Sequence, residues 1–123
     1  ETNMILEEPM MEEIVEPIIE QKGVFTGADN FHQGAGDLLV VRDEDTQFLR
    51  FENFSVTNGP DLFVTLNKGD GPEGEFKIVA PLKGNQGSQN YDISSYDLSE
   101  YQSVSIYCKA FSVEFATAEL KEV

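Results

Sequence analysis

The fold is decided by residues 47–67, which read QFLRFENFSVTNGPDLFVTLN. Two runs in which apolar and polar residues alternate lie on either side of a turn sequence at residues 58–61. Successive side chains of a strand point to opposite faces of the sheet, so Leu49 and Phe51 share one face of the first run. In the second run one face is entirely apolar and consists of Leu62, Val64 and Leu66. This pattern predicts two antiparallel strands that each bury one face in a core.

The same alternation continues on both sides of this unit, from residue 23 to the C-terminus. We predict strands at residues 23–26, 37–42, 47–53, 62–67, 76–80, 90–93, 104–109 and 111–120. Polar, glycine- and proline-rich turns separate them, including a hairpin tip at residues 43–46 and a turn at residues 68–72. Strands of this number need two packed sheets or a closed barrel, because a single sheet would leave an apolar face in water. We therefore predict an all-β antiparallel sandwich of about seven to nine short strands.

Composition divides the chain near Lys22. Residues 1–22 contain seven acidic residues and one basic residue, whereas residues 23–123 hold all ten glycines, nine phenylalanines and four tyrosines. We expect residues 1–22 to form an acidic N-terminal tether and residues 23–123 to form the folded domain.

Apolar pairs in the tether recur every four residues, as they would on one face of a helix: Met10/Met11, Ile14/Val15 and Ile18/Ile19. Pro17 would break such a helix, which disfavours an amphipathic partner-binding helix. We interpret the tether as irregular or partly helical, and either docked on the domain through these pairs or mobile.

Charge and residue counts exclude several classes of function. The 23 acidic and eight basic residues give a net charge of -15, which repels nucleic acid and anionic lipid and opposes self-association. One cysteine and one histidine exclude an internal disulfide, a Cys₄ or Cys₂His₂ zinc site and a His₂Cys copper site, and we predict no metal site. No apolar run is long enough for direct insertion in a membrane, and no signal peptide is visible. A chain that begins at Glu1 indicates that an upstream segment has been removed.

The alternation shifts phase near the end of the chain. Residues 104, 106 and 108 share one parity and are apolar, whereas the apolar residues Phe111, Val113 and Phe115 share the opposite parity. A bulge or a bend between sheets at residues 109–110 would keep both sets in the core. We therefore expect Cys108 to face inward, beside an irregularity where solvent reaches a side chain more easily than in a regular strand.

Four motifs, in this order, carry a resemblance to a known family: LRFENF at residues 49–54, NGPDL at 58–62, APLKGNQGSQNY at 80–91 and VSIYCKAFSVEF at 104–115. The chain resembles the DM-thirteen domain, also called the electron-transfer DM-thirteen domain, over roughly residues 22–121. The resemblance implies a β-sandwich-like fold. It also implies a small extracellular module that accompanies DOMON domains in animals and stands alone in bacterial exported or lipid-anchored proteins.

The resemblance further implies a redox role for Cys108, either as a free thiol or as a thiolate ligand to a prosthetic group such as haem. His32 matches a histidine that often precedes the second strand of the family and is the second candidate cofactor ligand. A Cys/His pair could hold haem iron, but the Cys-x-x-Cys-His attachment motif is absent and all three methionines lie in the tether. The cofactor is therefore left unknown. The structural alternatives are a buried, inert Cys108 and a loop histidine with a local hydrogen bond.

A glycine-rich polar loop precedes the predicted strand at 90–93. We interpret it as a candidate recognition loop formed by Asn85, Gln86, Ser88, Gln89, Asn90 and Tyr91. The alternative is a plain connection held by its own amide hydrogen bonds. No helix follows the glycines, which excludes a phosphate-binding loop.

No nucleophile, histidine and acid fall into a catalytic pattern, so we predict no catalytic residues and at most a thiol-dependent redox partner. The first functional hypothesis is an exported or cell-surface redox module that acts through Cys108 with a partner protein or cofactor, because a lone cysteine cannot close its own disulfide. The second is a non-enzymatic binding or adhesion module that uses the polar loop. Both place the protein outside the cytoplasm, secreted or held by an upstream membrane or lipid anchor.

Overall fold

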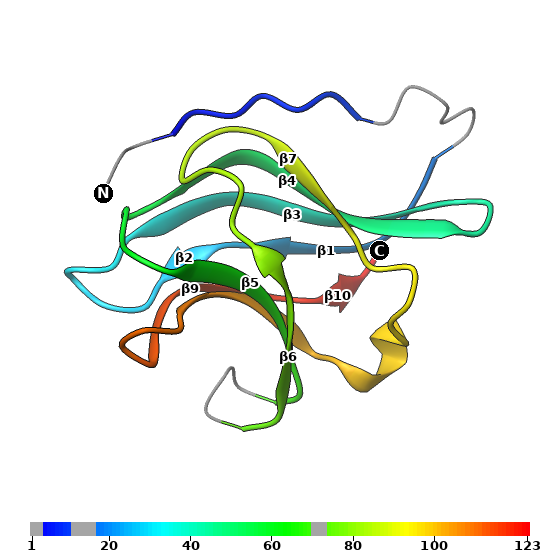
Figure 1. The fold of residues 1–123 in the computed structure, drawn as a ribbon. Coiled ribbons are helices and arrows are strands. Elements are labelled where there is room, and N and C mark those ends of the chain that lie inside the picture. Colours follow the sequence, from blue (N-terminus) through cyan, green and yellow to red (C-terminus); the bar gives the residue numbers. More distant parts are fainter. Residues whose placement is uncertain (1–3, 11–16, 70–73) are drawn as a thin grey trace.

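The computed structural model describes residues 4–10, 17–69 and 74–123. Two antiparallel five-stranded sheets form a sandwich (Figure 1), which confirms the predicted all-β fold. The first sheet has the order β10-β1-β3-β4-β7 and contains β1 (Ile18–Val24), β3 (Gly34–Asp43), β4 (Thr46–Val56), β7 (Gln89–Asp92) and β10 (Lys121–Glu122). The second has the order β2-β9-β8-β5-β6 and contains β2 (Thr26–Gly27), β5 (Leu62–Asn67), β6 (Phe76–Pro81), β8 (Ser103–Cys108) and β9 (Val113–Glu119). A single 3₁₀ turn, η1 (Leu98–Glu100), is the one helical element among the described residues.

Each predicted strand has a counterpart, and β5 has the predicted bounds. β1 begins at Ile18, earlier than residue 23, because residues 18–24 pair with β3 across a local register shift near Glu20. Ile18 and Ile19 therefore lie in a strand, whereas the pair at residues 14 and 15 lies outside the described residues. The hairpin tip at residues 43–46 joins β3 to β4 as predicted.

The core fills the space between the two sheets. Phe25, Phe51 and Phe54 form an aromatic cluster with ring centroids 4.9–5.1 Å apart. Aliphatic side chains from both sheets complete it, including Leu38, Val40, Leu49, Val64, Leu66, Val104 and Ile106. Full burial of each such side chain contributes roughly 1.5–3 kcal/mol to folding, so the predicted apolar faces provide the main stabilisation.

Part of the outward face of the second sheet is buried and polar. Thr65 and Asn67 have the outward parity of β5, yet both are fully buried. The Asn67 side-chain amide donates to the hydroxyls of Ser103 and Ser105 on β8 at 3.1 and 2.8 Å. These hydrogen bonds compensate for the burial of polar groups, which a simple alternation of apolar and polar residues does not predict.

The prediction of a bulge or a bend between sheets at residues 109–110 is wrong in position. Residues 109–112 make a turn that joins β8 to β9 within the same sheet, and a register shift lies opposite Ile106 and Tyr107. The turn and this bulge together absorb the phase shift. Phe111 is 68% exposed at the turn and is not a core residue, whereas Phe115 is buried as predicted.

Candidate functional site

Cys108 ends β8, between Leu62 of β5 and Val113 of β9. It faces inward as predicted, and its exposed fraction is 0%. The thiol donates a hydrogen bond of 3.0 Å to the carbonyl oxygen of Pro60, in the loop between β4 and β5. The prediction that solvent reaches Cys108 easily is therefore wrong. The 58–61 loop supplies a hydrogen-bond partner for the sulfur, and the neighbouring strands bury it.

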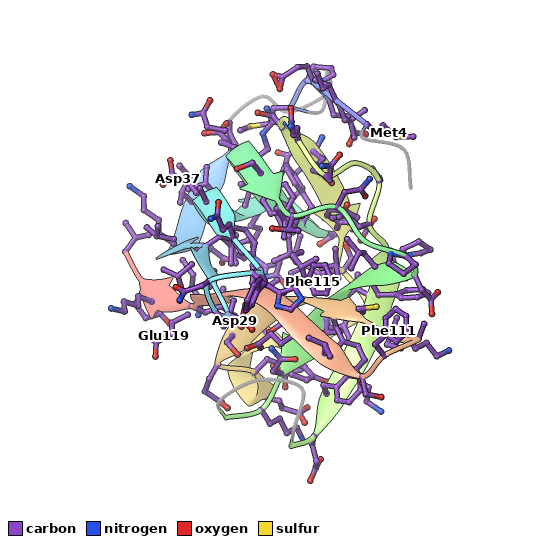
Figure 2. All side chains as sticks on the ribbon, turned by 90° about the vertical axis from the view of Figure 1, so that its left-hand side faces the viewer. Met4, Asp29, Asp37, Phe111, Phe115 and Glu119 are labelled. Carbon is purple, nitrogen blue, oxygen red and sulfur yellow. The ribbon has the colours of Figure 1, made fainter. Side chains whose placement is uncertain are left out.

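His32 lies in the loop between β2 and β3. Its Nδ1 lies 2.9 Å from a carboxylate oxygen of Asp29, and its ring packs on the Phe115 ring with centroids 4.3 Å apart. Asp29 and Phe115 lie next to each other in Figure 2. The hydrogen bond from His32, with others from the backbone N–H groups of residues 31 and 32, holds the pKa of Asp29 below its ordinary value. His32 thus makes the local hydrogen bond that the structural alternative predicted for a loop histidine.

The two candidate cofactor ligands do not meet. His32 packs on the Phe115 ring, and this ring lies against Gly59, where a Cβ would be only 2.7 Å from it. The Cys108 thiol instead contacts the next residue of the loop, Pro60. Within the part of the chain that the structure describes, no hydrogen bond or ring contact joins His32 to Cys108. A haem bound by both side chains would have to displace the Pro60 carbonyl from the Cys108 thiol.

The candidate recognition loop is largely buried. Asn85, Gln89, Asn90 and Tyr91 are buried, while Gln86 is exposed and Ser88 is half-buried. The Gln89 amide donates to the carbonyl oxygens of Gly84 and Gly87, which fixes the loop internally. The Tyr91 hydroxyl donates to Gln89 Oε1 and accepts the backbone N–H of Lys83. Burial raises the pKa of Tyr91 well above its ordinary value, so the phenol stays protonated.

Residues 4–10 lie along this loop, at the edge of the sheet that contains β4 and β7 (Figure 1). Three charged residues hold them there, and none of the three was a predicted site residue. Glu8 accepts two contacts of 2.9 and 3.2 Å from the Lys83 ammonium, and Arg50 Nη1 donates to the Glu8 carbonyl oxygen at 2.5 Å. Glu8 and Lys83 are 75 residues apart, so no spacing in the sequence could have indicated the pair.

A surface hollow has a volume of about 770 Å³. It lies beside β1, β10 and the end of β9, and its walls include Lys22, Asp37, Glu119 and Lys121. Figure 2 shows Asp37 and Glu119 on the same side of the molecule, away from Phe111. The sequence carries no signal for it, because four separate chain segments form its walls.

No group of three or more His, Cys, Asp or Glu side chains is arranged to hold a metal ion in the described ranges. Among the same residues no helix has the length and apolar character needed to cross a bilayer.

A family model described as electron transfer DM13 matches residues 25–120. The chain belongs to this family. Neither the curated proteins nor the solved structures contain a match to the chain. Membership confirms the resemblance to the DM-thirteen domain, indicates an electron-transfer-related module and points to a protein partner. The DM13 match includes Cys108, His32 and the whole polar loop, whereas residues 4–10 lie outside it.

Proposed function

We propose that this DM13 domain is a redox module whose reactive group is the thiol of Cys108 and whose partner is a protein with a redox-active disulfide. The observation that carries the proposal is the place of this thiol. Cys108 is the single sulfur-containing residue within the matched residues 25–120, because the three methionines are Met4, Met10 and Met11. It also lies at the end of a strand, next to two loops, rather than at the centre of the sandwich.

Two short loops control access to the sulfur. The Pro60 carbonyl binds the thiol, and the next carbonyl, that of Asp61, accepts the backbone N–H of Lys109 at 3.1 Å. Breaking these two hydrogen bonds would separate the 58–61 loop from the end of β8 without disturbing the aromatic cluster. Local opening of this kind requires less free energy than global unfolding.

The chemistry available to an opened thiol is exchange with a disulfide. The Cys108 thiolate attacks one sulfur of the partner's disulfide, a new S–S bond forms and the partner's S–S bond breaks. The second partner sulfur leaves as a thiolate and takes up the proton that Cys108 released. A thiolate of a second, dithiol protein then attacks the Cys108 sulfur and releases the first partner as a dithiol. The other thiol of the second protein displaces Cys108 and closes a disulfide, so two electrons pass from the second protein to the first and Cys108 returns to the thiol.

Phe111 supports a protein partner at this place. Its ring is 68% exposed on the turn that follows Cys108 directly, and exposed aromatic side chains are common anchors of protein interfaces. A location outside the cytoplasm, secreted or anchored, would supply the oxidising conditions in which such disulfides persist.

Thiol labelling of the native protein tests the proposal. We expect a chromogenic disulfide reagent to modify Cys108 slowly, but at least tenfold faster than the protein unfolds globally. Pro60→Gly, which keeps the carbonyl and loosens the loop, should increase the labelling rate, and Cys108→Ser provides the blank. Labelling that proceeds only at the rate of global unfolding in both the native protein and Pro60→Gly would overturn the redox proposal.

A further inference from the structure

The polar loop already binds an extended peptide, which is the chain's own residues 4–10. We name the loop residues 83–90 together with Arg50 the peptide groove. Residues 85–87 of the groove pair with the end of β4 on one side. The Val56 N–H donates to Asn85 O, and the Gly87 N–H donates to Phe54 O. Residues 4–8 pair with its other side in parallel orientation. The peptide therefore lies along the outer edge of the first sheet, where an added strand would lie.

Main-chain hydrogen bonds hold the peptide at regular intervals. Gln86 N–H donates to the Met4 carbonyl at 3.1 Å, and Leu6 N–H donates to the Gln86 carbonyl at 2.8 Å. Two residues further on, Glu8 N–H donates to the Ser88 carbonyl at 2.8 Å. Any extended peptide can make these three bonds, because they involve no side chain.

Side chains of alternate residues provide selectivity. Leu6, Glu8 and Met10 are half-buried against the domain, whereas Ile5, Glu7 and Pro9 are exposed. The Glu8 carboxylate accepts the Asn90 N–H at 2.9 Å as well as the Lys83 ammonium. Asn90 also donates its side-chain amide to the Pro9 carbonyl at 2.9 Å. The intervening Glu7 is exposed, but its carboxylate accepts the Ser88 N–H at 2.7 Å. The groove therefore selects an apolar residue followed two positions later by a glutamate, and it also contacts the acidic residue between them.

Glycines allow the peptide to approach the groove closely. A Cβ at Gly87 would overlap the carbonyl of Leu6, and one at Gly84 would lie 3.2–3.3 Å from Met4 O and Leu6 Cβ. Gly87 also has a φ of +99°, a conformation that other residues rarely adopt. The close contact of two backbones at Gly87 is the geometry that strand addition requires.

We propose that the peptide groove is a strand-addition site for an extended acidic segment of a partner protein, and that residues 4–10 occupy it within the chain until such a segment replaces them. The occupant must be acidic at the position of Glu8, because the Lys83 ammonium pairs with the carboxylate there, in a protein with only eight basic residues. Arg50 binds the main-chain carbonyl of the same position, which any peptide supplies. A separate partner is favoured over a second copy of this chain, because two copies each carry a net charge of -15 and repel one another. The proposal does not depend on the chemistry of Cys108.

Peptide binding to the full chain tests this inference. The probe is the N-acetylated, fluorescent peptide MILEEPM, which matches residues 4–10 and keeps the N–H that Met4 donates to Asn85 Oδ1 at 2.7 Å. In the unaltered chain the attached segment competes at a high effective concentration, so we expect weak binding. The full-chain variant Glu8→Lys weakens its own segment and should bind the probe about tenfold more tightly.

Matched controls separate the groove from a general charge effect. Glu44→Lys changes the net charge equally at an exposed hairpin position and should bind the probe as weakly as the unaltered chain. The double variant Glu8→Lys/Lys83→Glu should lose the gain, because the probe's glutamate then meets a glutamate. Equal binding by Glu8→Lys and Glu44→Lys would overturn the proposal. A concentration-dependent dimer of Glu8→Lys that the probe dissociates would also overturn it, in favour of a second copy as the occupant.

Discussion

The thiol of Cys108 donates a hydrogen bond of 3.0 Å to the carbonyl oxygen of Pro60, which precedes it by 48 residues. The bond connects the end of β8 to the loop that links the two sheets between β4 and β5. The sulfur therefore has two structural roles, as a buried apolar group and as the donor that fixes this loop. Any redox chemistry at Cys108 must first release the loop.

Cys108→Ala should destabilise the protein by about 1–2 kcal/mol. The substitution removes a buried sulfur and leaves the Pro60 carbonyl without this donor. Urea unfolding at pH 7 measures the change, with Ser95→Ala as an exposed control. A midpoint equal to that of the control would show that the sulfur contributes nothing to packing or to the loop.

Asn67→Ala should be among the most destabilising single substitutions, at about 2–4 kcal/mol. The Asn67 amide serves Ser103 and Ser105, and its oxygen accepts the hydroxyl of Thr65 at 2.8 Å. Removing it leaves buried hydroxyls unpaired and creates a cavity. Thermal unfolding checks the value against Asn30→Ala, which changes an exposed asparagine. A loss below about 1 kcal/mol would mean that water replaces these hydrogen bonds.

Docking of residues 4–10 should weaken as the pH falls. Burial acts to raise the pKa of Glu8, but the hydrogen bond from Asn90 and the charge of Lys83 outweigh it and hold the pKa below its ordinary value. The stabilisation is therefore complete above the unfolded pKa of about 4.3 and is lost as the pH falls through the lower folded pKa. Exchange protection of the Asn90 amide, followed from pH 6 to pH 3, reports this loss. Glu8→Gln should show no such change, and a pH-independent amide in both proteins would contradict the assignment.

Alternation was sufficient to predict the strands because side-chain parity is a local property. It placed β5 correctly and turned Cys108 inward, but it could not give the exposure of the sulfur, which depends on Pro60. The Asp29 and His32 pair lies within three residues and was within reach of sequence reasoning. Glu8 and Lys83 were not, because only the folded chain brings these distant residues together. The site thus divides into parts set by local pattern and parts set by long-range pairing.

Gly87→Ala should release residues 4–10 from the groove. The new methyl group would overlap the Leu6 carbonyl, and the positive φ of +99° adds backbone strain that alanine tolerates poorly. Gly69→Ala separates the backbone strain from the overlap with Leu6. Gly69 has a φ of +78°, but a Cβ there would have no atom within 4 Å. Both variants should lose about 1 kcal/mol of stability from strain, while Gly87→Ala alone should lose amide protection at Leu6 and Glu8. Limited proteolysis after Glu7 provides a second measurement, in which Gly87→Ala should be cut several times faster than Gly69→Ala. Equal cleavage rates would show that the close backbone contact at Gly87 does not hold the segment.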